Sequence, residues 1–182
     1  MTRGIIIFGS QGAGKTTLGK LVSKELGYQY FDIDDYIWRT DTEKPYTVMY
    51  SREEKINRLM NDIVKTNYFV MAGSMDSFNQ PFVPLFDLAV HLTASFEIRE
   101  KRLMKRAQNK FGNRILVGGD LYEENRKFIK SAENYDYDGS PSYKVHKIWA
   151  DSLPCKVLKL DGENSLKENM LKIIKEYKKI VE

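Results

Sequence analysis

The stretch that decides the fold is IIIFGSQGAGKT, residues 5–16. It begins with a β-branched run, Ile5–Phe8, which is typical of a buried strand, and continues into the pattern G-x-x-x-x-G-K-[ST]. In this pattern glycines let backbone N–H groups turn toward phosphate oxygens, the lysine adds a positive charge, and the hydroxyl can ligate Mg²⁺. The sequence therefore predicts that a nucleoside triphosphate is bound by Gly9, Ser10, Gln11, Gly12, Ala13, Gly14, Lys15, Thr16 and Thr17.

Chance and a dinucleotide fingerprint are the alternatives to this interpretation. The motif follows a predicted strand and precedes a helical pattern, residues 18–26, that stops at Gly27, and chance does not explain this context. The dinucleotide fingerprint G-x-G-x-x-G needs a different spacing from glycines 9, 12 and 14. We therefore expect triphosphate rather than dinucleotide binding.

Working outward, strand-like runs alternate with helical patterns along the rest of the chain. The further strands are expected at 30–33, 68–72, 87–92 and 156–160, and the further helices at 51–64, 98–107 and 166–181. Such alternation predicts βαβ units and an α/β fold of three layers, with helices on both faces of a parallel sheet. We expect a single domain over residues 1–182, with an acceptor-binding region at 34–66 and a lid at 107–126.

Composition sets the broad class of the protein. Hydrophobic residues make up 42% and charged residues 30%, a balance typical of a folded globular chain. Lys and Arg exceed Asp and Glu by 29 to 25, which suits anionic ligands without demanding nucleic acid. Cys155 alone allows neither an internal disulfide nor a cysteine metal cluster. No apolar run could span a membrane and no signal segment is evident, so we expect a cytoplasmic protein.

Three carboxylates follow the second expected strand, at Asp32, Asp34 and Asp35. Ligands of open parallel sheets bind outside the carboxyl ends of the strands. Asp32 is expected to hold Mg²⁺, together with Thr16, and Asp34 to orient or deprotonate an acceptor hydroxyl. The alternative is that these acids cap the N-terminus of a helix, the role we expect for Asp35.

A basic segment follows the fourth expected strand. Arg99, Arg102 and Arg106 lie at helical spacing on one face, and Arg114 follows after Gly112. Positioned arginines stabilise the negative charge that spreads over a phosphoryl group during transfer. We expect at least two of Arg102, Arg106 and Arg114 to contact phosphates in a closed state. A solvated helix face and a nucleic-acid patch are the alternatives, the second without any accompanying groove-reading motif.

Smaller signals concern the acceptor side. Gly73 ends the third strand and permits close approach of a substrate, Ser74 offers a hydrogen-bond donor, and Arg52 is a candidate anion clamp. His91 lies in an apolar strand, and His146 has no acidic partner at ligand spacing. For both histidines we expect a structural rather than a catalytic role.

Together these segments resemble the nucleoside-monophosphate-kinase-like P-loop kinases, which include adenylate, shikimate and gluconate kinases. The stretch DIDDYI, residues 32–37, is similar to the D-x-D-x-x-I pattern of shikimate kinases, whose first Asp serves the metal and whose second holds acceptor hydroxyls. Ser74 and Met75 depart from that family's glycine run, and Lys55 stands where its R-x-x-E clamp has an acid. The resemblance implies a five-stranded parallel sheet of order 2-3-1-4-5.

The sequence thus predicts a kinase that uses ATP and Mg²⁺. Its partners would be a nucleotide and a small-molecule acceptor, with a hydroxyl acceptor favoured over a nucleoside monophosphate because carboxylates repel phosphate. The alternative is a nucleotide-binding regulatory switch with slow hydrolysis. GTP as donor, the identity of the acceptor and the oligomeric state stay open.

Overall fold

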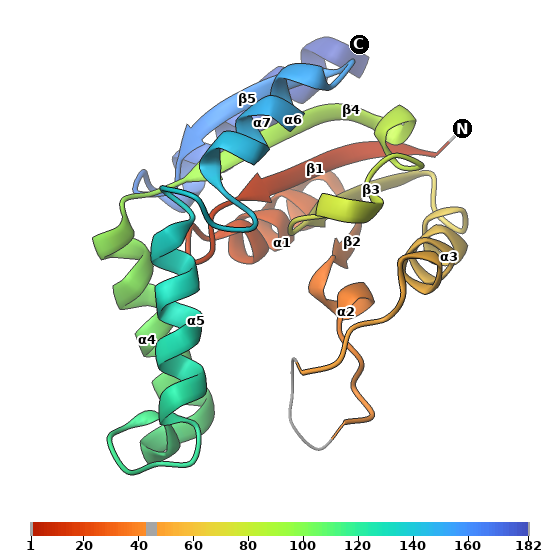
Figure 1. Ribbon diagram of the computed structural model, residues 1–182. Helices are drawn as coiled ribbons and strands as arrows, with labels where there is room; N and C mark the ends of the chain where they lie inside the picture. Colours follow the sequence, from red (N-terminus) through yellow and green to blue (C-terminus); the bar gives the residue numbers. More distant parts are fainter. Residues whose placement is uncertain (1, 43–46, 182) are drawn as a thin grey trace.

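Five parallel strands form one sheet, in the order β2-β3-β1-β4-β5. The structure is a computed structural model that describes residues 2–42 and 47–181. The strands are β1 (Arg3–Gly9), β2 (Gln29–Asp32), β3 (Tyr68–Ala72), β4 (Phe86–Thr93) and β5 (Lys156–Asp161). The predicted α/β fold and strand order are confirmed, with strand bounds shifted by at most two residues. Because all strands are parallel, the carboxyl ends of β1, β2 and β3 lie at one edge of the sheet (Figure 1).

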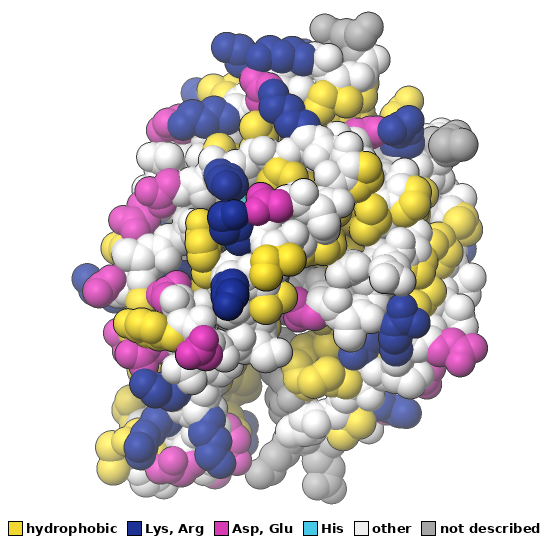
Figure 2. All heavy atoms as spheres, turned by 45° about the horizontal axis from the view of Figure 1, so that its top comes forward, with side chains coloured by type: hydrophobic (Ala, Val, Ile, Leu, Met, Phe, Trp, Pro, Cys, Tyr) yellow, Lys and Arg dark blue, Asp and Glu magenta, His cyan; other side chains and the backbone are white. Residues whose placement is uncertain are grey.

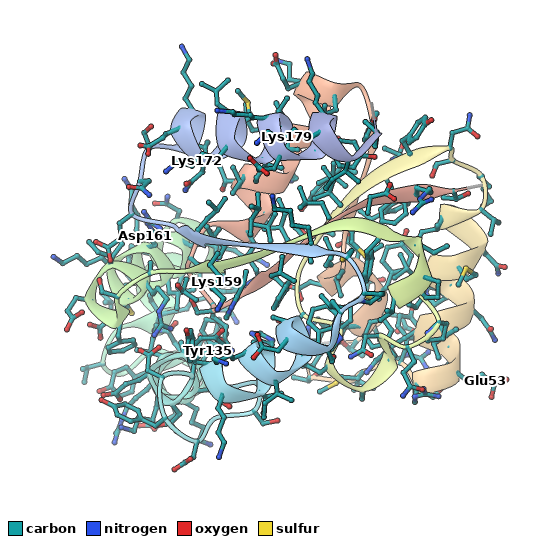
Figure 3. All side chains as sticks on the ribbon, turned by 90° about the horizontal axis from the view of Figure 1, so that it is seen from above. Glu53, Tyr135, Lys159, Asp161, Lys172 and Lys179 are labelled. Atoms are coloured by element: carbon teal, nitrogen blue, oxygen red, sulfur yellow. The ribbon has the colours of Figure 1, made fainter. Side chains whose placement is uncertain are left out.

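Successive side chains of a strand point to opposite faces of the sheet, and in the central strands both sets are apolar. Helices therefore cover both faces. Figure 3 shows α7 (Leu166–Val181) on one side of the strands and α6 (Tyr143–Ser152) on the other. Helix α1 (Lys15–Leu26) packs with α7 against Ile5 and Ile7. On the opposite face α3 (Arg52–Ile63) and α6 pack in a second cluster. The three-layer architecture is therefore built around two hydrophobic clusters.

A helical hairpin projects from the carboxyl edge of the sheet. It consists of α4 (Phe96–Phe111), the 3₁₀ turn η3 (Gly112–Ile115) and α5 (Tyr122–Asn134), which run side by side in Figure 1. The expected lid, residues 107–126, corresponds to the outer part of this hairpin. Helices α5 and α6 were not predicted from the sequence.

The region expected to bind the acceptor begins with a short helix, α2 (Asp34–Ile37), and ends in α3. Residues 43–46 of this region lie outside the described residues. A capping box at Ser51 begins α3: the Ser51 hydroxyl accepts from the Glu54 N–H, and the Glu54 carboxylate accepts from the Ser51 N–H. Two 3₁₀ turns, η1 (Asp76–Phe78) and η2 (Val83–Leu85), connect β3 to β4.

The surface carries charges of both signs. On the face shown in Figure 2, Lys and Arg side chains are interspersed with Asp and Glu. In the part of the chain that the structure describes, no helix has the length and apolar character needed to cross a membrane.

Candidate active site

The loop between β1 and α1 has the backbone geometry of an anion cradle. Gly9, Gly12 and Gly14 all have positive φ angles, of 134°, 80° and 105°. At Gly12 a side chain is also excluded by packing, since an added Cβ would lie 2.8 Å from the Arg99 carbonyl oxygen. The loop ends at the N-terminus of α1, whose helix dipole favours an anion there.

Two features of this loop fit a bound triphosphate. Ser10 Oγ and Gln11 Oε1 are buried without a hydrogen-bond partner among the described residues. The Lys15 ammonium donates to the carbonyl oxygens of Gly9 (3.0 Å) and Ser10 (2.8 Å), so it folds over the loop. Desolvation lowers the pKa of Lys15 to about 8, which leaves it mainly charged near neutral pH.

The end of β2 lies beside the first turn of α1. Asp32 Oδ2 accepts hydrogen bonds from Thr16 Oγ1 and from the Tyr30 hydroxyl, each at 3.2 Å. Mg²⁺ at nucleotide sites takes one or two protein oxygens and completes its shell with phosphates and water. The Thr16–Asp32 pair fits that donor set. Thr16 and Thr17 are both exposed in the first turn of α1.

Asp34 begins α2, directly after the strand end. Its N–H donates to Asp32 Oδ1 at 3.2 Å. The N-cap position of α2 is Ile33 and no side chain caps it, so the expected capping role of Asp35 is wrong. Partial desolvation, and then the neighbouring Asp32 carboxylate, raise the pKa of Asp34, while Lys15 and Arg106 oppose the shift. A carboxylate and two cations therefore face one another where donor and acceptor would meet.

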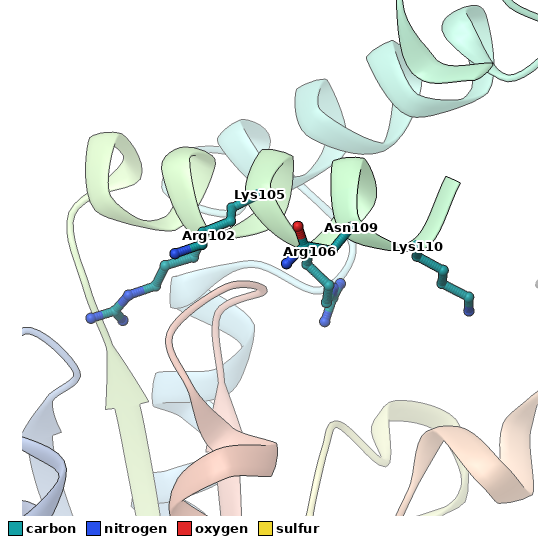
Figure 4. Close-up of a pocket in the computed structure, with 5 residues that line it drawn as sticks. All are labelled: Arg102, Lys105, Arg106, Asn109 and Lys110. Atoms are coloured by element: carbon teal, nitrogen blue, oxygen red, sulfur yellow. The ribbon is translucent and has the colours of Figure 1, made fainter. Parts of the chain in front are cut away.

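The basic helix α4 lies over the phosphate loop and lines an open groove of about 510 Å³, the α4 groove. Its lining residues are Arg102, Lys105, Arg106, Asn109 and Lys110 (Figure 4). Arg102 donates to the carbonyl oxygens of Ala13 (3.2 Å) and Gly162 (3.0 Å), so it joins the phosphate loop to the turn after β5. Arg106 extends into the groove, where it acts electrostatically on Lys15.

The arginines that were expected on one helix face lie in three different environments. Arg99 is fully buried and donates to the carbonyl oxygens of Ala94 and Ala132 and to the Asp136 carboxylate, so it secures the base of the hairpin. Arg114 lies near the tip of the hairpin in a two-point ion pair with Asp120, at 2.9 and 2.6 Å. Of the arginines expected at the phosphates, Arg102 is bonded to the loop, Arg106 lines the α4 groove, and Arg114 is paired with Asp120.

The residues expected to bind the acceptor include Gly73 and Ser74, which follow β3. Gly73 donates its N–H to the Ile7 carbonyl at 3.0 Å, which places this turn beside the strand that leads to the phosphate loop. Its φ is 136°, a conformation that favours glycine. An added Cβ would also lie 2.6 Å from Ile33 Cβ, so packing against Ile33 is by itself a sufficient reason for a glycine at this position. The exposed Arg52 begins α3 and donates to the Ser77 carbonyl at 2.8 Å, in the following turn η1.

A hydrogen-bond network that was not predicted from the sequence lies behind Ser74. Its hydroxyl lies 3.3 Å from His146 Nε2, and Asp76 Oδ1 lies 3.6 Å from the same nitrogen. The expectation that His146 lacks an acidic neighbour is thus wrong in space, although nothing in the local sequence indicates it. His91 is a buried, hydrogen-bonded core residue, as expected.

Comparisons with known proteins agree with this geometry. The sequence model of a family described as the AAA domain matches residues 5–127. An uncharacterized protein of Bacillus subtilis, YqaC, is 30% identical over 176 residues, which cover 96% of this chain and 97% of that protein. A shikimate kinase 2 of Photorhabdus laumondii is 25% identical over 142 residues, covering 74% of this chain and 81% of that protein.

A solved structure shares the fold. The shikimate kinase of Bacteroides thetaiotaomicron superposes with a TM-score of 0.56 at 21% identity, covering 96% of both chains. At this identity the likeness concerns the fold. The family match, by contrast, spans more than half of the chain and includes the phosphate loop, β2 and the hairpin arginines. The chain therefore belongs to the AAA-domain family of P-loop proteins and has kinases of small molecules among its relatives.

Proposed function

We propose that this protein is a kinase that transfers the terminal phosphoryl group of a nucleoside triphosphate to a small-molecule acceptor. The observation that carries the proposal is the phosphate loop, over which Lys15 folds, next to the strand end where Asp32 contacts both Thr16 and the Asp34 N–H. The similarity to a shikimate kinase over 74% of the chain supports the same activity.

The donor side would bind through the chain's own loop. Backbone N–H groups of residues 9–14 and the N-terminus of α1 would hold the phosphates, with Lys15 adding its charge. Thr16 and Asp32 would hold Mg²⁺, which supplies charge neutralisation on the phosphates when it is bound. Arg102 and Arg106 would act from α4, Arg102 through its bonds to the loop and Arg106 toward the transferring group.

Asp34 would work on the acceptor. A carboxylate at this place accepts a hydrogen bond from a hydroxyl and takes its proton as the new bond to phosphorus forms. Its raised pKa makes it a better base than an ordinary aspartate. Arg52, Gly73 and Ser74 would surround the acceptor from the other side.

A hydroxyl acceptor is favoured over a nucleoside monophosphate. The neighbouring carboxyl groups of Asp32 and Asp34 disfavour a second phosphate, whereas either group can accept a hydrogen bond from a hydroxyl. A cytoplasmic location remains a prediction of the sequence.

The test is phosphoryl transfer from ATP, and separately from GTP, with Mg²⁺ to a panel of acceptors. The panel contains hydroxy acids, polyols, nucleosides and nucleoside monophosphates. We expect one hydroxyl acceptor to be phosphorylated, and both Lys15→Ala and Asp34→Asn to lower its turnover by about 10²-fold or more. Tight ATP binding without consumption of any acceptor, with slow hydrolysis that survives Asp34→Asn, would contradict the proposal.

A further inference from the structure

A chain of hydrogen bonds runs from the acceptor side into the core behind it. The Tyr135 hydroxyl lies 3.0 Å from His91 Nε2 and 2.9 Å from His146 Nδ1, and His146 Nε2 lies 3.3 Å from Ser74 Oγ. Tyr135, His91 and His146 are at most 2% exposed. The four residues come from β4, the end of α5, α6 and the turn after β3, so the network connects the base of the hairpin with the acceptor side.

One end of this chain of hydrogen bonds reaches a partly exposed residue, Ser74. Ser74 is partly exposed, whereas both flanking residues, Gly73 and Met75, are buried. The turn that carries Ser74 is bonded to Ile7, on the strand that leads into the phosphate loop. The Ser74 hydroxyl therefore has one side on His146 and another side toward the open end of the sheet.

Asp76 has an unusual backbone conformation that brings it to the same histidine. Its φ is 24°, and it is the only non-glycine residue with positive φ in the described part of the chain. Such conformations are unfavourable and persist where surrounding contacts hold them. Here the result is a carboxylate oxygen 3.6 Å from His146 Nε2, beside the Ser74 contact.

The proton count of the chain allows two arrangements of the neutral network. The Tyr135 hydroxyl has one proton, so it donates to one imidazole and accepts from the other. If Tyr135 donates to His91, His146 Nε2 is unprotonated and turns a lone pair toward the Asp76 carboxylate. If Tyr135 donates to His146 Nδ1, His146 Nε2 carries the proton and is attracted by that carboxylate. The charge of Asp76 thus selects the second arrangement.

We propose that His146 is a positioning residue whose Nε2–H donates to Ser74 Oγ, so that the Ser74 hydroxyl donates its own hydrogen bond to an oxygen of the acceptor. The acceptor group at this point would be an oxygen with a free lone pair, in a hydroxyl, carbonyl or carboxylate. This inference rests on the proposed function, since it assigns Ser74 a partner in the kinase reaction.

The first experiment determines the tautomer of His146 and does not require enzymatic turnover. In ¹⁵N-labelled protein near neutral pH, correlation spectra of the imidazole rings distinguish protonated from unprotonated nitrogens. The chain has two histidines, so His146→Gln identifies the signals of His146. We expect a protonated Nε2 and an unprotonated Nδ1 in His146, and inversion toward a protonated Nδ1 in Asp76→Asn, whose amide can donate to Nε2. An unprotonated Nε2 in the wild type would overturn the proposal.

The second experiment measures kinetics with the acceptor found in the panel. Asn tolerates positive φ, so Asp76→Asn is a mild change that should leave the melting temperature and the ATP KM unaltered. We expect Ser74→Ala and Asp76→Asn each to raise the acceptor KM about 3- to 10-fold with little change in kcat, as loss of one hydrogen bond implies. The double variant should be no worse than Ser74→Ala, because Asp76 acts through Ser74.

Two kinetic results would refute this role of Ser74. One is an unchanged acceptor KM in Ser74→Ala, and the other is a double variant whose effect equals the product of the single effects. Absence of transfer to every acceptor would instead refute the proposed function, while the nitrogen spectrum would still decide the orientation of the hydrogen bond at Ser74.

Discussion

The proposed donor and acceptor halves of the site are built in different ways. The donor half is one continuous stretch, residues 9–17, in which the backbone makes the binding surface and a few side chains add charge. The acceptor half collects side chains from α2, α3, α6 and the turn after β3, and its hydrogen bonds join residues far apart in the chain. A phosphate can thus be recognised by a local motif, whereas an acceptor is recognised by tertiary structure.

The strongest test of this contrast is Lys15→Ala. Lys15 is the only lysine that the structure places on the loop carbonyls of Gly9 and Ser10, within the described residues. Loss of a preorganised charge at the transferring phosphate should lower kcat/KM by about 10³-fold or more. The matched control is Lys24→Ala, an exposed lysine in the last turn of the same helix. If Lys15→Ala kept more than a tenth of the wild-type kcat/KM, the loop backbone would be sufficient for phosphoryl transfer without the lysine.

Asp34→Asn tests where the two halves meet. We expect kcat to fall about 10²-fold, the lower range for loss of a general base, with the affinity for ATP nearly unchanged. The matched control is Asp35→Asn, the next residue, which should retain activity. Because the pKa of Asp34 is raised, wild-type kcat should decline on acidification at a higher pH than an ordinary aspartate would give. Equal losses in both variants would remove Asp34 from its proposed role.

The kcat values of Arg106→Ala and Arg114→Ala test how far along the hairpin the donor half extends. Arg106 extends into the α4 groove, so its loss should lower kcat about 10- to 50-fold, whereas Arg114 is paired with Asp120 and should matter less than about 3-fold. Lys105→Ala serves as the control within the groove. If Arg114→Ala matches Arg106→Ala in kcat, the tip of the hairpin moves onto the phosphates during turnover, as the sequence led us to expect.

The fold and the donor half follow from local sequence. The β-branched run before Gly9, the loop pattern and the capping box at Ser51 each act within a few residues, so their structures are readable without the rest of the chain. The different environments of the arginines, by contrast, could not be predicted from local sequence. Periodicity places Arg99 and Arg106 on one face, yet Arg99 is buried because the end of α5 supplies its partners.

The sequence indicated Arg52, Gly73 and Ser74 on the acceptor side, but the hydrogen-bond network behind Ser74 could not be predicted for the same reason. Ser74 and His146 are 72 residues apart, and only the packing of α6 against the sheet brings them together. His146 also depends on Tyr135, at the end of a helix that the sequence did not reveal. Hydrogen bonds of this kind are fixed by the completed fold.

The last and smallest prediction concerns stability on the acceptor side. Burial lowers the pKa of His91 to about 4, from 6.5 in the unfolded chain, and nearby His146 adds to the shift. Between these values the unfolded state binds the proton and the folded state does not, so the free energy of unfolding falls as pH decreases from about 6.5 toward about 4. We expect a loss of about 2 kcal/mol between about pH 7 and about pH 5 from this group.

Urea unfolding of the wild type and of His91→Gln across this range measures the effect. Each protein is compared with its own stability near neutral pH, so the cost of the substitution itself cancels. The slope should be smaller in His91→Gln, because glutamine does not titrate, while Lys24→Ala should keep the wild-type slope. An equal slope in His91→Gln would mean that the network around Tyr135 opens before His91 is protonated. The acceptor half would then owe its pH dependence to local opening rather than to a buried neutral histidine.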